Sequence, residues 1–321
     1  MDKKIFALTL AILMTALCFF GCGKENTDAE TTTEAPEETT AANILSGDRN
    51  PLTGKSGYSG VNAGGKMIGI VVENSPDARP QWGMSTPDIV MEYEVEGGIS
   101  RMLWLYADAN YIPEKVGPVR SARHDIVELA LGFDMLFVHC GQSYIARDLM
   151  AAHPELTEID GMKSYDFFKR DTTRNTASEH RLCLLGKTFA AELASLGKDL
   201  TVEEGKKFPF RFEDENSGRE LTGGECSEIK FSYSGNYNFV FTRNAASGLY
   251  ECALNGKPRT DDSGAVCAYS NVIILYTDMT DMGDKDHHQD LLLEKGGRGV
   301  YVNGGRYEEI TWQKTQTQIR A

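Results

Sequence analysis

The stretch Met91-Glu92-Tyr93-Glu94-Val95-Glu96-Gly97-Gly98-Ile99-Ser100-Arg101 joins two strand-like runs, 88–96 and 99–107. Apolar and aromatic residues are frequent in both runs, and two glycines stand between them. Two such runs joined by a short glycine turn are typical of a β-hairpin. The stretch therefore predicts two antiparallel strands within residues 88–107.

The segments around this hairpin predict a sheet with helices packed on it. The apolar run 67–72 ends at the turn signal Asn74-Ser75-Pro76, and 135–140 has the composition of a second buried strand. Helices are expected after a cap at Ser121, over 143–152 and through 189–193, because apolar residues recur there at helical spacing. The fold class is thus predicted as α+β, a mixed sheet with helices in a layered sandwich.

From about Cys226 the composition becomes typical of β structure. The runs 229–233, 238–242 and 272–276 are rich in β-branched and aromatic residues and are separated by Ser-Gly, Asn-Gly and Gly-Gly turns. We therefore expect an α+β domain over 50–222, followed by a smaller, mainly β domain over 223–321.

The N-terminus has the pattern of an export signal. Lys3 and Lys4 precede an uncharged apolar run, 5–20, which is short for a membrane span, and Gly21-Cys22 follows. The pattern predicts a cleaved lipoprotein signal peptide over 1–21 and lipid attachment at Cys22. The acidic, Thr/Glu-rich segment 22–49 has almost no apolar residues and is predicted to be a disordered linker. We expect the protein at the extracytoplasmic face of the cell membrane, anchored by lipid.

Charge and cysteine content exclude several classes of site. The net charge is −14, and −15 once Asp2, Lys3 and Lys4 are removed with the signal, which disfavours nucleic acid as a partner. The spacing of the remaining cysteines contains no Cys-x-x-Cys, so a zinc ribbon or a thioredoxin-like site is not expected. Cys252 and Cys267 flank an expected hairpin and could pair, but burial as small apolar side chains is the favoured role. No disulfide is assigned among Cys140, Cys183, Cys226, Cys252 and Cys267.

Glu92, Glu94 and Glu96 form the first candidate group. On a strand, alternate side chains share a face, so these carboxylates are expected ~6.5 Å apart. That spacing lies within the range of about 5–9.5 Å that separates paired glycosidase carboxylates. The favoured interpretation is the solvated face of a hairpin, with a positively charged group opposite the carboxylates.

Four arginines, Arg79, Arg101, Arg120 and Arg123, form the second candidate group. Arginine favours planar, bidentate partners such as carboxylate or phosphate. Two interpretations stay open: a binding site for an anionic ligand, or ion pairs with the nearby Asp and Glu residues that hold the fold together.

Two further segments are weaker candidates. The run 135–143 predicts a strand, a glycine turn and a helix with Ser143 at the bend, but the second glycine of a nucleophile elbow is absent. His139 and Cys140 are expected to face opposite sides of the strand, which disfavours a nucleophile and base pair. The segment 278–290 holds several Asp and His residues but fits no standard metal-ligand spacing, so a solvated acidic loop is expected and no metal or cofactor is predicted.

The sequence resembles the YerB family of bacterial lipoproteins. The matching stretches in the first part include Ala78-Arg79-Pro80-Gln81, Asp88, Glu92, Glu96-Gly97-Gly98-Ile99-Ser100-Arg101, Gly117-Pro118-Val119-Arg120-Ser121-Ala122-Arg123 and Gly141-Gln142-Ser143. In the second part, Asn255-Gly256-Lys257-Pro258, Asp261, Asn271-Val272-Ile273 and Thr311-Trp312-Gln313-Lys314 match. The resemblance implies a lipoprotein with two such domains and no established activity. Arg259 departs from the family's usual His, and the chain ends soon after Trp312, which leaves open that the last domain is incomplete.

These observations lead to one preferred function and two alternatives. We expect a membrane-anchored binding module for an anionic envelope ligand, either a cell-wall glycan or a phosphate-bearing ligand. The expected ligand-binding residues are Arg79, Gln81, Asp88, Glu92, Glu96, Arg101, Arg120, Ser121, Arg123 and Ser143. The alternatives are a cell-wall glycan hydrolase that uses Glu92, Glu94 or Glu96, and a scaffold lipoprotein without a ligand; whether the protein is an enzyme stays open, and no catalytic residue is assigned.

Overall fold

The computed structural model describes residues 49–58, 65–201, 210, 212, 220–314 and 319–320. The predicted signal peptide, Cys22 and the linker up to residue 48 lie outside the described residues. All described residues belong to one compact unit, Asn43–Ala321. The predicted domain boundary at 222/223 stays a prediction.

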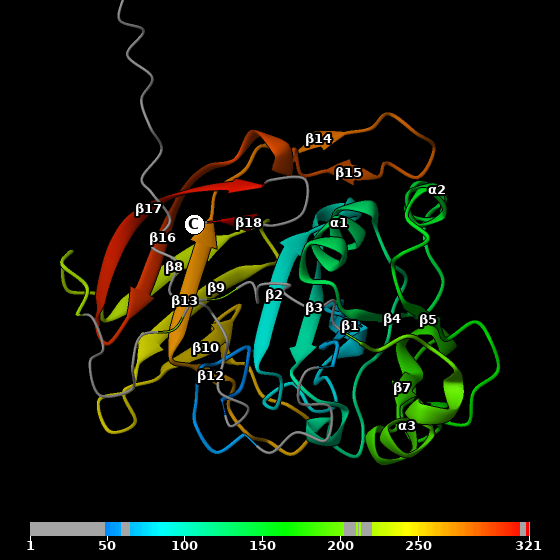
Figure 1. Cartoon of the computed structure of the whole chain (residues 1–321). Coiled ribbons are helices and arrows are strands. Elements are labelled where there is room, and N and C mark those ends of the chain that lie inside the picture. The colour runs from blue at the N-terminus through cyan, green and yellow to red at the C-terminus, as the bar shows by residue number, and fades with distance from the viewer. Residues whose placement is uncertain are drawn as a thin grey trace, which may run out of the picture. The chain divides into compact units, whose positions relative to one another are not determined.

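A mixed five-stranded sheet stands at the centre of the fold, in the order β2-β3-β1-β4-β5 (Figure 1). Strand β1 (Ile68–Glu73) is antiparallel to β3 (Ser100–Tyr106), which pairs with β2 (Ile89–Glu94). On its other side β1 is parallel to β4 (Leu136–His139), and β4 is parallel to β5 (Glu158–Asp160). The predicted α+β class with a mixed sheet is confirmed.

The hairpin between β2 and β3 forms as predicted, but its turn is longer. Gly97 and Gly98 have φ angles of 75° and 65°, a region that favours glycine, and the last paired residues are Glu94 and Ser100. Residues Glu96–Gly98 form a short 3-10 turn. The prediction that Glu92, Glu94 and Glu96 stand in one row on a strand is therefore wrong, because Glu96 lies beyond the end of β2.

Two helices cover one side of the sheet, and a third lies on the other. They are α1 (His124–Phe133), α2 (Tyr144–Ala152) and α3 (Gly186–Glu192). The predicted helix start at Ser121 is wrong: Arg123 is the N-cap of α1, and the Ser121 hydroxyl donates to the Cys140 carbonyl at 3.0 Å. The helix predicted over 143–152 forms, with Ser143 as its N-cap, since the Ser143 Oγ accepts from the Ala146 N–H at 3.1 Å.

The remaining described elements are mostly short strands. A two-stranded sheet pairs β6 (Phe168–Arg170) with β7 (Leu182–Leu184). A second five-stranded sheet holds β8 (Glu228–Ser232), β9 (Asn238–Arg243), β10 (Tyr250–Leu254), β11 (Lys257–Pro258) and β12 (Ala268–Tyr269). A four-stranded sheet holds β13 (Asn271–Leu275), β16 (Gly297–Asn303), β17 (Arg306–Lys314) and β18 (Ile319–Arg320), and a hairpin pairs β14 (Thr280–Asp281) with β15 (Gln289–Asp290). Single 3-10 turns lie at Pro76–Ala78, Ala109–Tyr111, Ser178–Arg181, Leu193–Leu196 and Leu293–Lys295.

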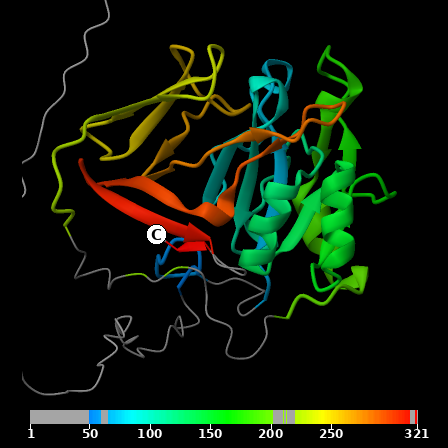
Figure 2. The same cartoon turned by 90° about the horizontal axis from the view of Figure 1, so that it is seen from above.

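The central sheet is buried on both faces. One face, which includes Ile70 and Trp104, shares a core with Phe189 of α3 and with Phe239 and Tyr250 of the second sheet. The other face packs on α1 and α2, and Leu291, Leu293 and Trp312 from the C-terminal part join that core. In Figures 1 and 2 the cyan central strands lie between the green α2–α3 part and most of the yellow-to-red strands, whereas the orange β14–β15 hairpin extends over α1 toward α2. The mainly β C-terminal part is thus confirmed, and it shares both cores with the first part.

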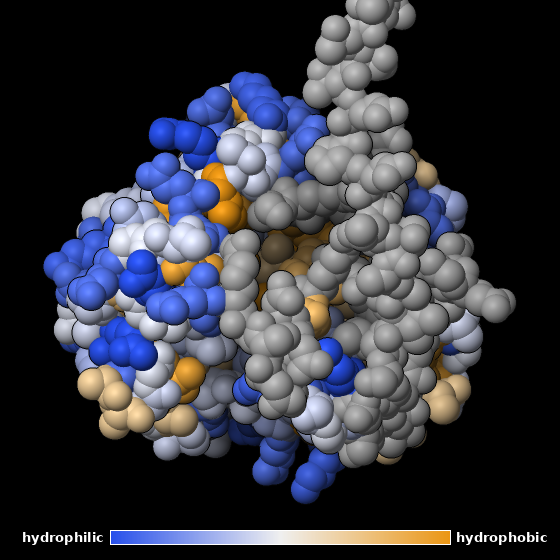
Figure 3. Space-filling model, turned by 60° about the vertical axis from the view of Figure 1, so that its left-hand side comes forward, coloured by the Kyte–Doolittle hydropathy of each residue, from blue (hydrophilic) through white to orange (hydrophobic). Residues whose placement is uncertain are grey.

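Where Figure 3 colours the described residues, hydrophilic side chains dominate and hydrophobic ones form small separate spots. Among the described residues, no helix combines the length and the apolar composition that a membrane crossing requires. Cys252 and Cys267 are free and buried, in line with the expected role as small apolar side chains. Cys183 is also free and buried, and Cys140 and Cys226 are free and partly buried.

Candidate functional site

Asn74, directly after β1, brings three of the predicted site residues together. Its amide N–H groups donate to Glu92 Oε1 at 2.7 Å and to the Ser100 hydroxyl at 2.8 Å. Its Oδ1 accepts from Arg79 Nε at 3.1 Å and from Gln81 Nε2 at 2.9 Å. The Arg79 guanidinium also lies 4.9 Å from the centre of the Tyr237 ring. Arg79, Gln81 and Glu92 therefore form one network around a buried amide.

Glu92 forms an ion pair with Arg259 from the C-terminal part. Arg259 Nη1 lies 2.7 Å from Glu92 Oε2, and both side chains are largely buried. Burial is the largest single influence and lowers the pKa of Arg259, but the charge and hydrogen bond of Glu92, together with nearby Cys252 and Tyr269, raise it overall. Glu92, one of the predicted site residues, therefore has its ion-pair partner in Arg259, and both Glu92 oxygens accept hydrogen bonds.

Glu96 and Arg123 form a second, partly buried ion pair. Arg123 Nε lies 3.1 Å from each Glu96 oxygen, and Arg123 Nη2 also contacts Glu96 Oε1. Burial alone would raise the pKa of Glu96, but the Arg123 hydrogen bonds and charge hold it below its ordinary value. Arg123 thus forms an ion pair with a carboxylate, as expected if these arginines hold the fold together by internal ion pairs.

Arg101 lies beside this pair with a different set of contacts. It is 3% exposed, its Nη1 donates to the Ser121 carbonyl at 2.9 Å, and its Nε has no hydrogen-bond partner. In the part of the chain that the structure describes, no carboxylate lies within ion-pair distance of Arg101. Burial, and then the charge of Arg123, lower the pKa of Arg101 to about 10, so the group is charged at neutral pH.

Arg120 is more exposed than Arg101 and Arg123. Its side chain is 24% exposed, and its Nε lies 3.4 Å from Glu73 Oε2 without forming a hydrogen bond. Glu73 Oε2 also contacts His180 Nδ1 at 2.9 Å. Neither Glu73 nor His180 was among the predicted site residues, because only the folded chain brings 73, 120 and 180 together.

The turn 140–143 lies next to Arg120 and Ser121. The Cys140 N–H donates to the Arg120 carbonyl at 3.0 Å, and the Ser143 N–H donates to the Ala122 carbonyl at 3.1 Å. The Gln142 Oε1 is buried and has no hydrogen-bond partner. His139 is fully buried and contacts Glu158 Oε2 at 2.7 Å and the Gly141 carbonyl at 2.9 Å. Ser143 and His139 thus have structural contacts of their own, and neither forms a nucleophile and base pair with Cys140.

These residues gather at the carboxyl ends of parallel strands. Strands β1, β4 and β5 run in the same direction and end at Glu73, His139 and Asp160. From β1 the chain continues to β2 and β3 on one side, whereas from β4 it continues to β5 on the other. In open sheets a ligand binds where connections diverge in this way. We call Glu73, Glu96, Arg101, Arg120 and Arg123 the edge cluster.

Two predicted residues have other positions. Asp88 lies away from the edge cluster, where it accepts from the Asn50 side chain at 2.9 Å and from the Ala107 N–H at 2.8 Å. Among the described residues no arginine forms an ion pair with Glu94, and burial raises the pKa of Glu94. Of the three carboxylates considered for glycan hydrolysis, Glu92 and Glu96 are therefore held by arginines.

The acidic segment 278–290 is only partly a solvated loop. It contains the β14–β15 hairpin, in which exposed His287 contacts Asp281 Oδ2 at 2.8 Å. Two groups of metal-ligand type lie here among the described residues: Asp284 with Asp286 and His288, and Asp290 with His124 and Asp125 of α1. His124 and Asp125 were not predicted as site residues, because Asp290 is far from them in the sequence.

Comparison with known proteins gives the family. The "Protein of unknown function (DUF3048) N-terminal domain" matches residues 52–199, and the corresponding C-terminal domain matches residues 228–321. The Bacillus subtilis (strain 168) protein described as "Putative lipoprotein YerB" is 28% identical over 290 residues, which span 84% of this chain and 79% of that protein. The crystal structure of YerB from Bacillus subtilis matches with a TM-score of 0.70 and 27% identity, covering 84% of this chain and 89% of that one. The predicted resemblance and the predicted fold are both confirmed.

Proposed function

We propose that this chain, which belongs to the two-domain DUF3048 family, binds an anionic cell-envelope ligand at the edge cluster while anchored by lipid on Cys22. The lipid anchor is proposed because the chain is similar to the protein described as "Putative lipoprotein YerB". The anchor places the domain at the extracytoplasmic face of the membrane. Envelope polymers that carry phosphate or carboxylate groups are the ligand class.

The observation that carries this proposal is the buried charge of Arg101. A buried guanidinium without a carboxylate partner costs free energy, and a bound anion lowers that cost. In the edge cluster, three guanidinium groups face two carboxylates, Glu73 and Glu96. The cluster thus carries one net positive charge within a net-acidic chain.

Arg120 is the residue expected to contact the ligand. It is partly exposed, and its Nε has no hydrogen bond to its neighbour Glu73. Arg101 lies behind it and adds positive potential, while Arg123 is held by Glu96. A planar guanidinium at this edge is suited to bidentate recognition of phosphate or carboxylate.

The test compares two arginine variants of the full chain in detergent. Soluble muropeptides and teichoic-acid fragments serve as probes, and affinity is measured by titration calorimetry. Arg120→Gln should weaken binding by about tenfold or more, since a charged hydrogen bond contributes about 1.5–3 kcal/mol. Arg147→Gln removes the same charge from an exposed residue of α2 and should leave affinity unchanged. Equal affinity of wild type and Arg120→Gln, or no binding of either probe, would refute the proposal.

A scaffold role is the second candidate. It is favoured by the Glu92–Arg259 and Glu96–Arg123 pairs, which satisfy predicted site residues internally. Under this alternative, Arg120→Gln lowers the melting temperature and neither probe binds. A glycan hydrolase is less well supported, because that reaction needs two available carboxyl groups and two of the three considered are held by arginines.

A further inference from the structure

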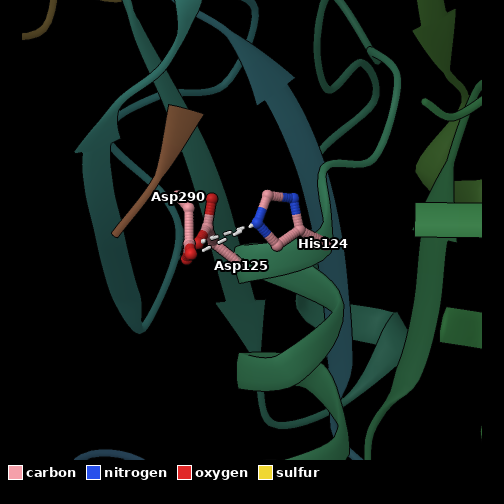
Figure 4. A group of neighbouring side chains, drawn as sticks. All are labelled: His124, Asp125 and Asp290. Atoms are coloured by element: carbon pink, nitrogen blue, oxygen red, sulfur yellow. Dashed lines mark ion pairs between the residues drawn. The ribbon is translucent and has the colours of Figure 1, made fainter. Parts of the chain in front are cut away.

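His124, the first residue of α1, is a buried side chain that lacks hydrogen bonds. It is 7% exposed, and neither of its ring nitrogens has a hydrogen-bond partner. Buried polar groups are almost always satisfied, so an exception calls for an explanation. Figure 4 shows that the ring directs one nitrogen toward the carboxylates of Asp125 and Asp290.

The distances in this group are those of ligands around an ion. His124 Nε2 lies 3.6 Å from Asp125 Oδ1 and 3.7 Å from Asp290 Oδ1, and the three ligand atoms lie within 4.8 Å of one another. Both distances exceed the 2.7–3.2 Å of an N–H···O hydrogen bond. Ligands about 2.0–2.2 Å from one ion lie roughly 3.0–3.5 Å apart. Each carboxylate oxygen would therefore need to move only a few tenths of an ångström relative to the imidazole nitrogen.

The positions of the two carboxylates are set by different parts of the fold. Asp125 follows His124 in α1, and its Oδ1 accepts from the Leu291 N–H at 3.1 Å. Asp290 is the last residue of β15, directly before Leu291, and its side chain is partly exposed. The hydrogen bond to Leu291 therefore holds the end of the β14–β15 hairpin against the start of α1 and brings the third ligand to the group.

We propose that His124, Asp125 and Asp290 bind a divalent transition-metal ion of the zinc type. One imidazole nitrogen with two carboxylate oxygens suits such an ion, whereas Ca²⁺ and Mg²⁺ prefer oxygen ligands throughout. Three protein ligands leave a fourth position for water or another small ligand. The ion links α1 to the C-terminal hairpin, so its binding stabilises the contact between the two parts of the chain.

The neighbouring His288 provides a matched control. It is buried like His124, but its ring Nδ1 already contacts Asp284 Oδ2 at 2.6 Å. The backbone N–H of His288 donates to Asp284 Oδ1 at 2.9 Å. It lies on the same hairpin and also has carboxylates nearby. A general affinity of this acidic hairpin for cations would therefore depend on His288 as much as on His124.

The experiment uses the full chain in detergent, without a histidine tag and after removal of metals with a chelator. Titration with ZnCl₂ should give one tight equivalent and a melting temperature that rises with zinc concentration. Asp290→Asn and His124→Gln should each weaken zinc binding by about tenfold or more, since even changes around metal ligands cost 10- to 100-fold. His288→Gln should keep the tight equivalent, and CaCl₂ should not replace zinc.

Three results would overturn the proposal. They are the absence of a tight zinc equivalent in the wild type, unchanged zinc binding in Asp290→Asn, and loss of binding in His288→Gln alone. Asp290→Asn changes a partly exposed side chain, so the test stays decisive if His124→Gln fails to fold.

Discussion

Glu92 and Glu96 both bind a guanidinium group, but each has a partner from a different part of the chain. Glu92 pairs with Arg259 across the boundary between the central sheet and the C-terminal part, and Glu96 pairs with Arg123 at the start of α1. Glu94 lies between them in sequence and has a pKa raised by burial. At the scale of single residues, three similar carboxylates thus have three different environments.

The Glu96–Arg123 pair predicts part of the pH dependence of stability. The pKa of Glu96 is lower in the folded chain than its ordinary value of 4.5. Its contribution is therefore present above about pH 4.5 and is lost as the pH falls through the folded pKa. Glu96→Gln should be less stable than wild type at pH 7 and should lose less stability between pH 5 and pH 3, as measured by urea unfolding.

Exposed Glu179 supplies the control for this comparison. Glu179→Gln removes the same charge from the short turn Ser178–Arg181 and should leave the acid dependence close to that of wild type. If the two variants show the same acid dependence, the Glu96 carboxylate does not contribute in the expected way.

At the scale of elements, two serines with similar sequence contexts have different roles. Ser121 lies two residues before Arg123, the N-cap of α1, and its hydroxyl donates a hydrogen bond to the Cys140 carbonyl. Ser143, in contrast, is the N-cap of α2. Pairing of the Gly141–Ser143 turn with Ala122 places Ser121 against Cys140, so a tertiary contact replaces the expected cap.

Loss of the α2 cap should have a modest, local effect. Ser143→Ala removes the acceptor of the Ala146 N–H and should lower the free energy of unfolding by about 1 kcal/mol. Ser178→Ala, at an exposed position, should change stability by less than about 0.5 kcal/mol. Thermal and urea unfolding of both variants check this prediction, and equal effects would argue against the cap.

At the scale of the whole molecule, the second part of the chain packs directly against the region around Asn74. The Tyr237 hydroxyl donates to the Asn74 carbonyl and the Tyr233 hydroxyl donates to the Glu92 carbonyl, each at 2.8 Å. With the Glu92–Arg259 pair and the shared apolar core, these bonds couple the two parts.

A double-mutant cycle measures this coupling. Glu92→Gln leaves a buried arginine unpaired and should cost roughly 3–5 kcal/mol, and Arg259→Met should cost a similar amount. The double variant should cost clearly less than the sum, because no charge is then left without a partner. The exposed Lys230–Glu228 pair of β8 provides the control and should contribute less than about 1 kcal/mol. Additive effects at Glu92 and Arg259 would contradict the coupling.

The sequence by itself determined the features that depend on neighbouring residues. Alternation and the Gly97-Gly98 turn predicted the hairpin, helical spacing and Ser143 predicted α2, and the β-rich composition after Cys226 predicted the C-terminal sheets. It also named Arg101 and Arg120. These features could be predicted because strand, turn and helix preferences act over a few residues.

Only the tertiary structure decided which charged groups meet. Glu73 and His180 join Arg120, Arg259 reaches Glu92, and Asp290 comes to His124 from segments that are distant along the chain. Composition and spacing carry no signal for such contacts, because they depend on how both faces of the central sheet are covered. The packing of the C-terminal strands against that sheet therefore decided that Glu92 pairs with Arg259 and that Asp290 lies beside His124.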